Sequence, residues 1–108
     1  MSYNLNNLFP KPTIYASSYV ADQRLAVDNT SGGVQFATTF NGSTNMVMFD
    51  VQDADVMCTV DGSAPTSTNG HRLYQGTTYT WSTTMAQNAK FIRQGATNAA
   101  IHASELQL

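Results

Sequence analysis

The sequence predicts an all-β fold, an antiparallel β-sandwich or jelly roll of about eight short strands with an extended N-terminal arm. Thr, Ser, Asn and Gln make up about a third of the 108 residues, which suits extended strands with polar outer faces and frequent turns. Short apolar alternations separated by turn signals run along the chain. No amphipathic helix of about 10 to 15 residues lies between them, which argues against a parallel sheet.

The first 12 residues are expected to form an arm outside the sandwich. Pro10-Lys11-Pro12 ends this segment and excludes a regular helix or a central strand. The remaining residues, 13–108, are expected to form a single domain, because a chain of this length buries roughly 65% of its unfolded surface. The apolar side chains of the arm pack either on their own domain or on a neighbour, and they are Tyr3, Leu5, Leu8 and Phe9.

The first half of the domain is expected to contain four strands. Residues 13–20 and 25–28 form two short extended pieces, and the turn cluster 29–33 closes the second. Residues 34–40 and 47–51 are then expected to form a β-hairpin, because the apolar residues Val34, Phe36 and Phe40 share one face of the first run and Val47, Phe49 and Val51 share one face of the second.

The turn of this hairpin is Asn41-Gly42-Ser43-Thr44. Met46 and Met48 lie on the face opposite to Val47 and Phe49. Because this strand has apolar side chains on both faces, we expect it to lie centrally in a sheet or under a partner.

The second half, from Asp55 to Leu106, is richest in hairpin signals. Asp61-Gly62 and Ala64-Pro65 enforce the end of the first strand in this half. One helical turn is expected after the third. The expected strands are residues 56–60, 71–74, 77–82, 90–93 and 99–106, and the helical turn is residues 83–88.

Charge and targeting signals exclude several classes of partner. The formal net charge is -2 and the five basic residues are scattered, so no basic stripe is present and no nucleic-acid partner is expected. The N-terminus lacks the basic start and apolar run of a secretory signal, so we expect synthesis in a cytoplasm. No apolar run approaches the roughly 18 residues of a membrane span, so no membrane association is expected.

No group of residues has the spacing of a catalytic or metal site, so neither enzymatic activity nor a cofactor is expected. Ser63 lacks a nucleophile elbow, and the histidines, His71 and His102, form no zinc motif. The single Cys58 lies in an apolar alternation and is expected to be a buried small side chain. Four carboxylates that are close in sequence could supply oxygen ligands to calcium, but their spacing does not match an EF-hand loop. They are Asp50, Asp53, Asp55 and Asp61.

The aromatic residues of the second half allow two interpretations. They form either an exposed platform on which sugars stack or part of the core or an interface, and their alternating strand positions favour the latter. Trp81 is expected to be buried. The residues concerned are Tyr74, Tyr79, Trp81 and Phe91.

Two families resemble parts of this half. Residues 56–66, Val-Met-Cys-Thr-Val-Asp-Gly-Ser-Ala-Pro-Thr, with Asn69 to Tyr74 and Gly76, resemble the small Ig-like module at the ends of chitobiase-type and other carbohydrate-active enzymes. The continuation through Thr80-Trp81-Ser82, residues 89–93 and residues 99–106 resembles small virion proteins of tailed bacteriophages, which decorate or cement capsids.

The virion resemblance agrees better with an unexported, weakly charged chain that carries an apolar arm. It implies a non-enzymatic structural protein on the capsid surface, with the major capsid protein or other virion proteins as partners. It further implies a homo-oligomer, with a trimer at a local threefold position as one form. A tail or neck component and a carbohydrate-binding accessory module are the alternatives. The expected partner-binding residues are those four apolar arm residues together with Met46 and Met48.

Overall fold

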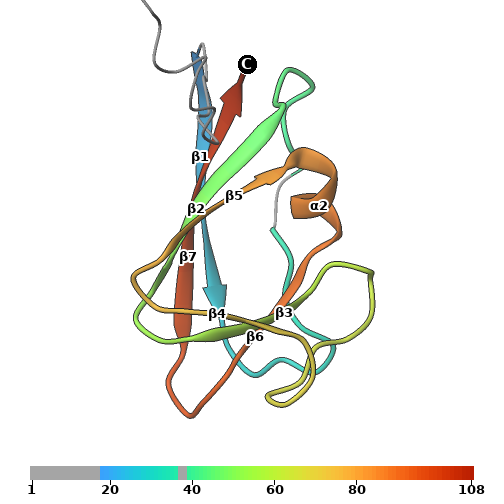
Figure 1. Ribbon diagram of the computed structural model, residues 1–108, viewed down its shortest axis with the longest axis vertical. Coiled ribbons are helices and arrows are strands. Elements are labelled where there is room, and N and C mark those ends of the chain that lie inside the picture. Colours follow the sequence, from blue (N-terminus) through green and yellow to red (C-terminus); the bar gives the residue numbers. More distant parts are fainter. Residues whose placement is uncertain (1–17, 37–38) are drawn as a thin grey trace, which may run out of the picture.

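The computed structural model describes residues 18–36 and 39–108 and confirms the all-β class, with seven strands in two antiparallel sheets (Figure 1). The four-stranded sheet has the order β1-β7-β2-β5, and the three-stranded sheet has the order β4-β3-β6. The strands are β1 (Ser18–Val27), β2 (Met46–Gln52), β3 (Val56–Thr59), β4 (His71–Leu73), β5 (Thr78–Ser82), β6 (Lys90–Arg93) and β7 (Ala99–Gln107).

The core lies on one face of the four-stranded sheet. Figure 1 shows the three-stranded sheet crossing the lower part of this face, with the short helix α2 (Thr83–Asn88) above it. Phe49 from β2, Ile101 from β7 and Phe91 from β6 are all fully buried in a single cluster. We call the side of the four-stranded sheet that faces this cluster the inner face, and the opposite side the outer face.

The strand with apolar side chains on both faces lies centrally, as predicted. β2 pairs with β7 along one edge and with β5 along the other. Val47, Phe49 and Val51 point to the inner face and are inaccessible to solvent. Alternation in the sequence therefore assigned the two faces of this strand correctly.

The predicted hairpin between residues 34–40 and 47–51 is wrong. Val34 pairs instead with Phe91 of β6, through backbone hydrogen bonds of 2.7 and 2.8 Å in the two directions. The turn between the two runs does form, because the Thr44 amide donates to the Asn41 carbonyl at 2.9 Å. An alternating pattern indicates which face of a strand is buried but does not select the neighbouring strand, and here β7 and β5 occupy both edges of β2.

Of the two predicted pieces at residues 13–20 and 25–28, residues 18–20 and 25–27 are extended as predicted, but the predicted break between them is wrong. β1 is one continuous strand from Ser18 to Val27, with a bulge between Tyr19 and Ala21. The polar residues in its middle alternate between the two faces rather than break the strand. Residues 1–17, and with them the predicted arm, lie outside the described residues.

The second half follows the predictions closely. Each of the five strands expected there is present, with ends shifted by at most a residue or two. The helical turn at residues 83–88 is capped by Ser82, whose Oγ accepts a hydrogen bond from the Met85 amide at 3.2 Å. Among the described residues no helix is long and apolar enough to cross a membrane.

Candidate interaction surface

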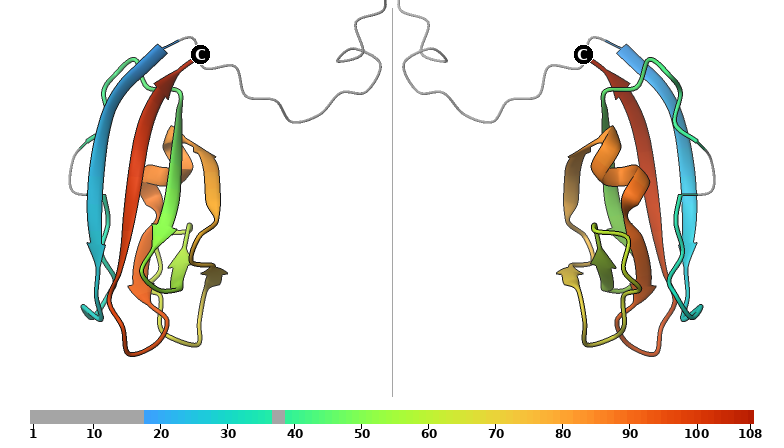
Figure 2. Two further views of the ribbon diagram at one scale, coloured as in Figure 1. Left: turned by 90° about the vertical axis from the view of Figure 1, so that its left-hand side faces the viewer. Right: turned by 90° about the vertical axis from the view of Figure 1, so that its right-hand side faces the viewer.

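The outer face of the four-stranded sheet, which is turned toward the viewer in the left view of Figure 2, carries apolar side chains at one end. The register places Tyr19 of β1 beside Leu106 of β7, and Leu106 beside Met46 of β2. Met48 follows two residues along β2, on the same face. Tyr19 and Met48 are exposed over 62% and 40% of their surface, whereas Met46 and Leu106 are half-buried. We call these four residues the apolar end.

This arrangement brings together two of the predicted partner-binding residues, Met46 and Met48, and adds two that the sequence reasoning missed. Leu106 was detectable, because alternation along β7 places Ala103 and Glu105 on the inner face and Leu106 on the outer one. Tyr19 was not detectable. The bulge after it shifts the alternation of β1, so its face cannot be counted from Leu25 and Val27.

The middle of the outer face is polar and internally hydrogen-bonded. The Asp22 carboxylate accepts from Ser104 Oγ at 2.6 Å and lies 3.4 Å from His102 Nε2. The Ser104 hydroxyl, with a smaller contribution from His102, lowers the pKa of Asp22 below its ordinary value. The outer face thus changes along the strands from an apolar to a polar part, and Met48 lies at the boundary, directly opposite Ser104.

The polar part extends to the basic residue of β1. Arg24 donates to Gln52 Oε1 at 2.7 Å, and its guanidinium lies 3.8 Å from the Asp53 carboxylate. Asp50 accepts from Gln52 Nε2 at 3.1 Å. These groups are exposed, so each contact contributes no more than about 1 kcal/mol to the free energy of unfolding.

Three of the four aromatic residues considered for a sugar platform pack inward, as the core interpretation predicted. The Trp81 ring packs edge-on against Phe49, with ring centroids 4.8 Å apart, and stacks on the fully buried Phe91, with centroids 6.2 Å apart. Trp81 itself is only partly buried. Tyr79 stacks on Phe49 at 5.5 Å. Tyr74 alone of the four is exposed, and the Arg72 guanidinium covers its ring at 5.5 Å from the centroid.

The candidate calcium carboxylates serve as local hydrogen-bond acceptors. Asp55 binds the Arg72 guanidinium at 2.8 Å and accepts from the Gln75 amide at 2.8 Å, and both contacts lower its pKa. Asp61 accepts from the amide and the hydroxyl of Ser63 in an Asx turn. In the part of the chain that the structure describes, no group of three or more potential metal ligands converges.

The remaining candidates are placed as follows. Cys58 is 1% exposed, as predicted, and burial raises the pKa of its thiol to about 11. His71 lies on β4, and His102 lies on the outer face of β7. His71 lies directly opposite Cys58 in the register of β4 and β3, but among the described residues neither histidine belongs to a group of three or more potential metal ligands.

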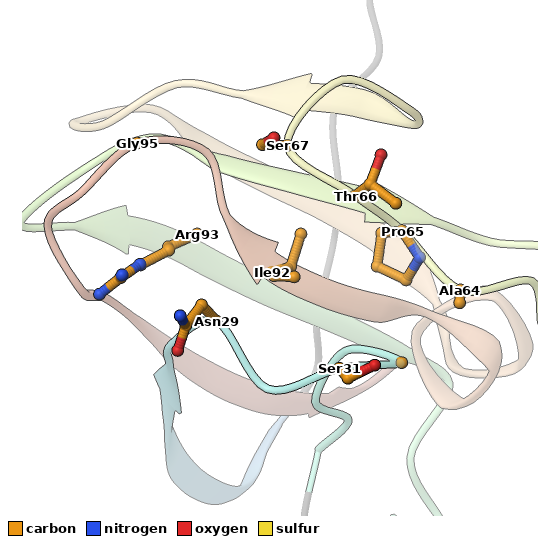
Figure 3. Close-up of a pocket in the computed structure, with 10 residues that line it drawn as sticks. Asn29, Ser31, Ala64, Pro65, Thr66, Ser67, Ile92, Arg93 and Gly95 are labelled. Carbon is orange, nitrogen blue, oxygen red and sulfur yellow. The ribbon is translucent and has the colours of Figure 1, made fainter.

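A surface pocket of about 480 Å³ lies beyond the end of β1 that is remote from Tyr19 (Figure 3). Ile92 and Pro65 form its apolar part, and Asn29 and Arg93 lie at its other end. The Arg93 guanidinium is already engaged, because it donates to Asn98 Oδ1 at 2.7 Å. The pocket therefore offers small apolar and neutral polar contacts rather than a free charge.

Comparison with protein-family models, with curated proteins and with solved structures finds no match for the chain. The candidate surface is accordingly assigned from its own geometry.

Proposed function

We propose that this chain is a non-enzymatic structural protein of a tailed bacteriophage virion, made in the host cytoplasm. Its role is that of a capsid decoration or cement protein that binds the major capsid shell and stabilises it. The apolar end of the outer face, together with the arm residues Tyr3, Leu5, Leu8 and Phe9, makes the contact.

The observation that carries the proposal is the exposure of Met48 and Tyr19 at the same end of the outer face, with Leu106 and Met46 between them. The outward face of a sheet strand normally carries polar residues, as the neighbouring rows of this sheet do. Methionine adapts its shape to a partner surface, and tyrosine combines apolar area with a hydroxyl group. Burial of these two side chains against a shell would remove apolar surface that the isolated chain leaves in water.

Composition and resemblance support the same role. Only 11% of the residues are charged, so little charge must be desolvated when a large surface is covered. The virion resemblance covers parts of β5, β6 and β7, and β7 contributes Leu106 to this surface. The same surface would serve in a tail or neck position.

The test is co-sedimentation of the purified chain with shells assembled from the major capsid protein of the same phage, followed by electron microscopy. We expect ordered additional density on the shell. Met48→Glu is expected to weaken binding at least about tenfold, because it places an unpaired carboxylate in a desolvated apolar contact and about 1.4 kcal/mol is a factor of ten.

Met85→Glu is the matched control. Met85 is 36% exposed on α2, which packs on the inner side of the sheet, so the same substitution there should leave shell binding unchanged. Equal binding by both variants would show that the apolar end is not the contact. Failure of the wild-type chain to bind shells would overturn the capsid role, and binding to purified tails instead would assign the chain to the tail or neck.

A further inference from the structure

β1 has one edge that pairs with a strand and one that does not. It is the outermost strand of the four-stranded sheet and pairs with β7 over its whole length (Figure 2). Within residues 18–36 and 39–108 no strand pairs with its second edge, and the backbone N–H and C=O groups along an unpaired strand edge are a template for pairing with another chain. We propose that this edge pairs with the same edge of a second copy, antiparallel, around a two-fold axis at Gln23.

The two-fold symmetry restricts the register. Residues directly opposite each other on neighbouring strands point to the same face of a sheet, so the axis must stand perpendicular to the sheet and lie midway between one residue and the same residue of the second copy. Near the middle of β1 the choices are Asp22, Gln23 and Arg24. An axis at Asp22 or Arg24 places that residue opposite itself, and like charges directly opposite are destabilising.

An axis at Gln23 instead pairs opposite charges twice. Asp22 of each copy then lies opposite Arg24 of the other, on the outer face, where both side chains are exposed. The regular part of the pairing runs from Ala21 to Leu25, because the bulge between Tyr19 and Ala21 ends it. Two such pairs fix both the register and the choice of partner, because any other register loses them.

Gln23 itself supplies a second, independent observation. In the part of the chain that the structure describes, its Nε2 is the buried side-chain donor that lacks a hydrogen-bond partner. In the proposed pairing the two Gln23 side chains face each other across the axis, with their Cβ atoms about 4.5–5.5 Å apart. Because Nε2 is enclosed in the single chain, the Gln23 side chain must turn toward the axis, where each amide has the Oε1 of the other copy as an acceptor, which satisfies a group that is costly to leave unpaired.

The test is sedimentation equilibrium of the full chain across a concentration series. We expect a dimer for the wild type. Asp22→Arg and Arg24→Asp are each expected to be monomeric, because each substitution places like charges opposite each other at both pairs. An equimolar mixture of these two variants is expected to form a heterodimer, since every Arg of one copy then lies opposite an Asp of the other.

Association on mixing separates pairing from misfolding, because a variant that merely fails to fold is not rescued by another. Asp61→Arg makes the same charge change in the loop after β3 and should remain dimeric. A monomeric full-length wild type overturns the proposal. This holds even if a variant that lacks residues 1–17 is dimeric. A trimeric wild type, dimeric single variants, or a mixture that stays monomeric would also overturn it.

The proposed function and the edge pairing fail separately. A monomeric chain that binds shells would overturn the edge pairing alone. A dimer that ignores both shells and tails would overturn the proposed function alone.

Discussion

Glu105→Ala tests the one acidic side chain that lies on the inner face of the four-stranded sheet within the described residues. Glu105 is 3% exposed and lies between Ala21 and Val47 on the neighbouring strands. Its Oε1 accepts from the Asn41 amide at 2.9 Å and from Thr44 Oγ1 at 3.0 Å. The carboxylate thereby holds the turn that leads into β2 against the end of β7.

The expected loss follows from the two donors. Removal of the carboxylate leaves the buried Thr44 hydroxyl without this acceptor, which costs about 1–3 kcal/mol. The Asn41 amide loses less, because that residue is exposed and water replaces part of the contact. Relief from burying a charge offsets some of the sum. We therefore expect the free energy of unfolding to fall by about 2 kcal/mol. Each kcal/mol lost lowers the Tm of a domain of this size by about 4–8 °C.

Urea denaturation followed by the fluorescence of Trp81 measures this loss, with the slope m as a check on two-state unfolding. Glu105→Gln keeps the acceptor oxygen and is expected to lose less than half as much. Thr44→Val combined with Glu105→Ala should cost less than the sum of the single variants, because the two share one hydrogen bond. A Glu105→Ala protein within about 0.5 kcal/mol of wild type would refute the reasoning.

Two further predictions concern the three-stranded sheet and its loops. The pKa of Asp55 is lowered in the folded chain, so its contribution to stability is present above the unfolded pKa of about 4 and is lost as the pH falls through the lower folded value. The difference in unfolding free energy between wild type and Asp55→Asn, measured by denaturation at several pH values, should therefore shrink on acidification. A difference that stays constant with pH would contradict this. Gly70→Ala should destabilise by about 1–3 kcal/mol or more, because φ is +134° and a Cβ atom there would lie 2.6 Å from the Cys58 carbonyl oxygen. Gly95→Ala, where no atom lies within 4 Å and φ is not positive, is the control and should melt within a few degrees of wild type.

The sequence predicted which face of a strand is buried better than it predicted which strands pair with each other. Alternation assigned Val47 and Phe49 to the core side of β2 and Met48 to the other side, and the structure agrees. The same pattern suggested that residues 34–40 pair with β2, and this was wrong. Face assignment depends on local period-2 burial, whereas the choice of neighbour depends on contacts far apart in the chain.

β7 illustrates that limit. β7 pairs with β1, about 80 residues earlier in the chain, and with β2. It thereby brings the residues of β1 and β2 together on one outer face. No local signal in residues 99–107 identifies either partner. The apolar end was accordingly only half predictable, because Met46 and Met48 are visible in one alternating run while their contact with Leu106 and Tyr19 is a product of the sheet order.

The two proposals are geometrically compatible, because of the direction of the axis. A two-fold axis perpendicular to the sheet at Gln23 keeps the outer faces of both copies on the same side of the joined eight-stranded sheet, twice the four strands of one copy. Each dimer would then present two apolar ends, each built around Tyr19 and Met48, toward one partner surface. Linked contacts of this kind bind more tightly than either alone, because the second forms at high effective concentration. A weak apolar contact on a small domain would thus suffice for stable attachment when the partner surface repeats, as the shell of a particle does.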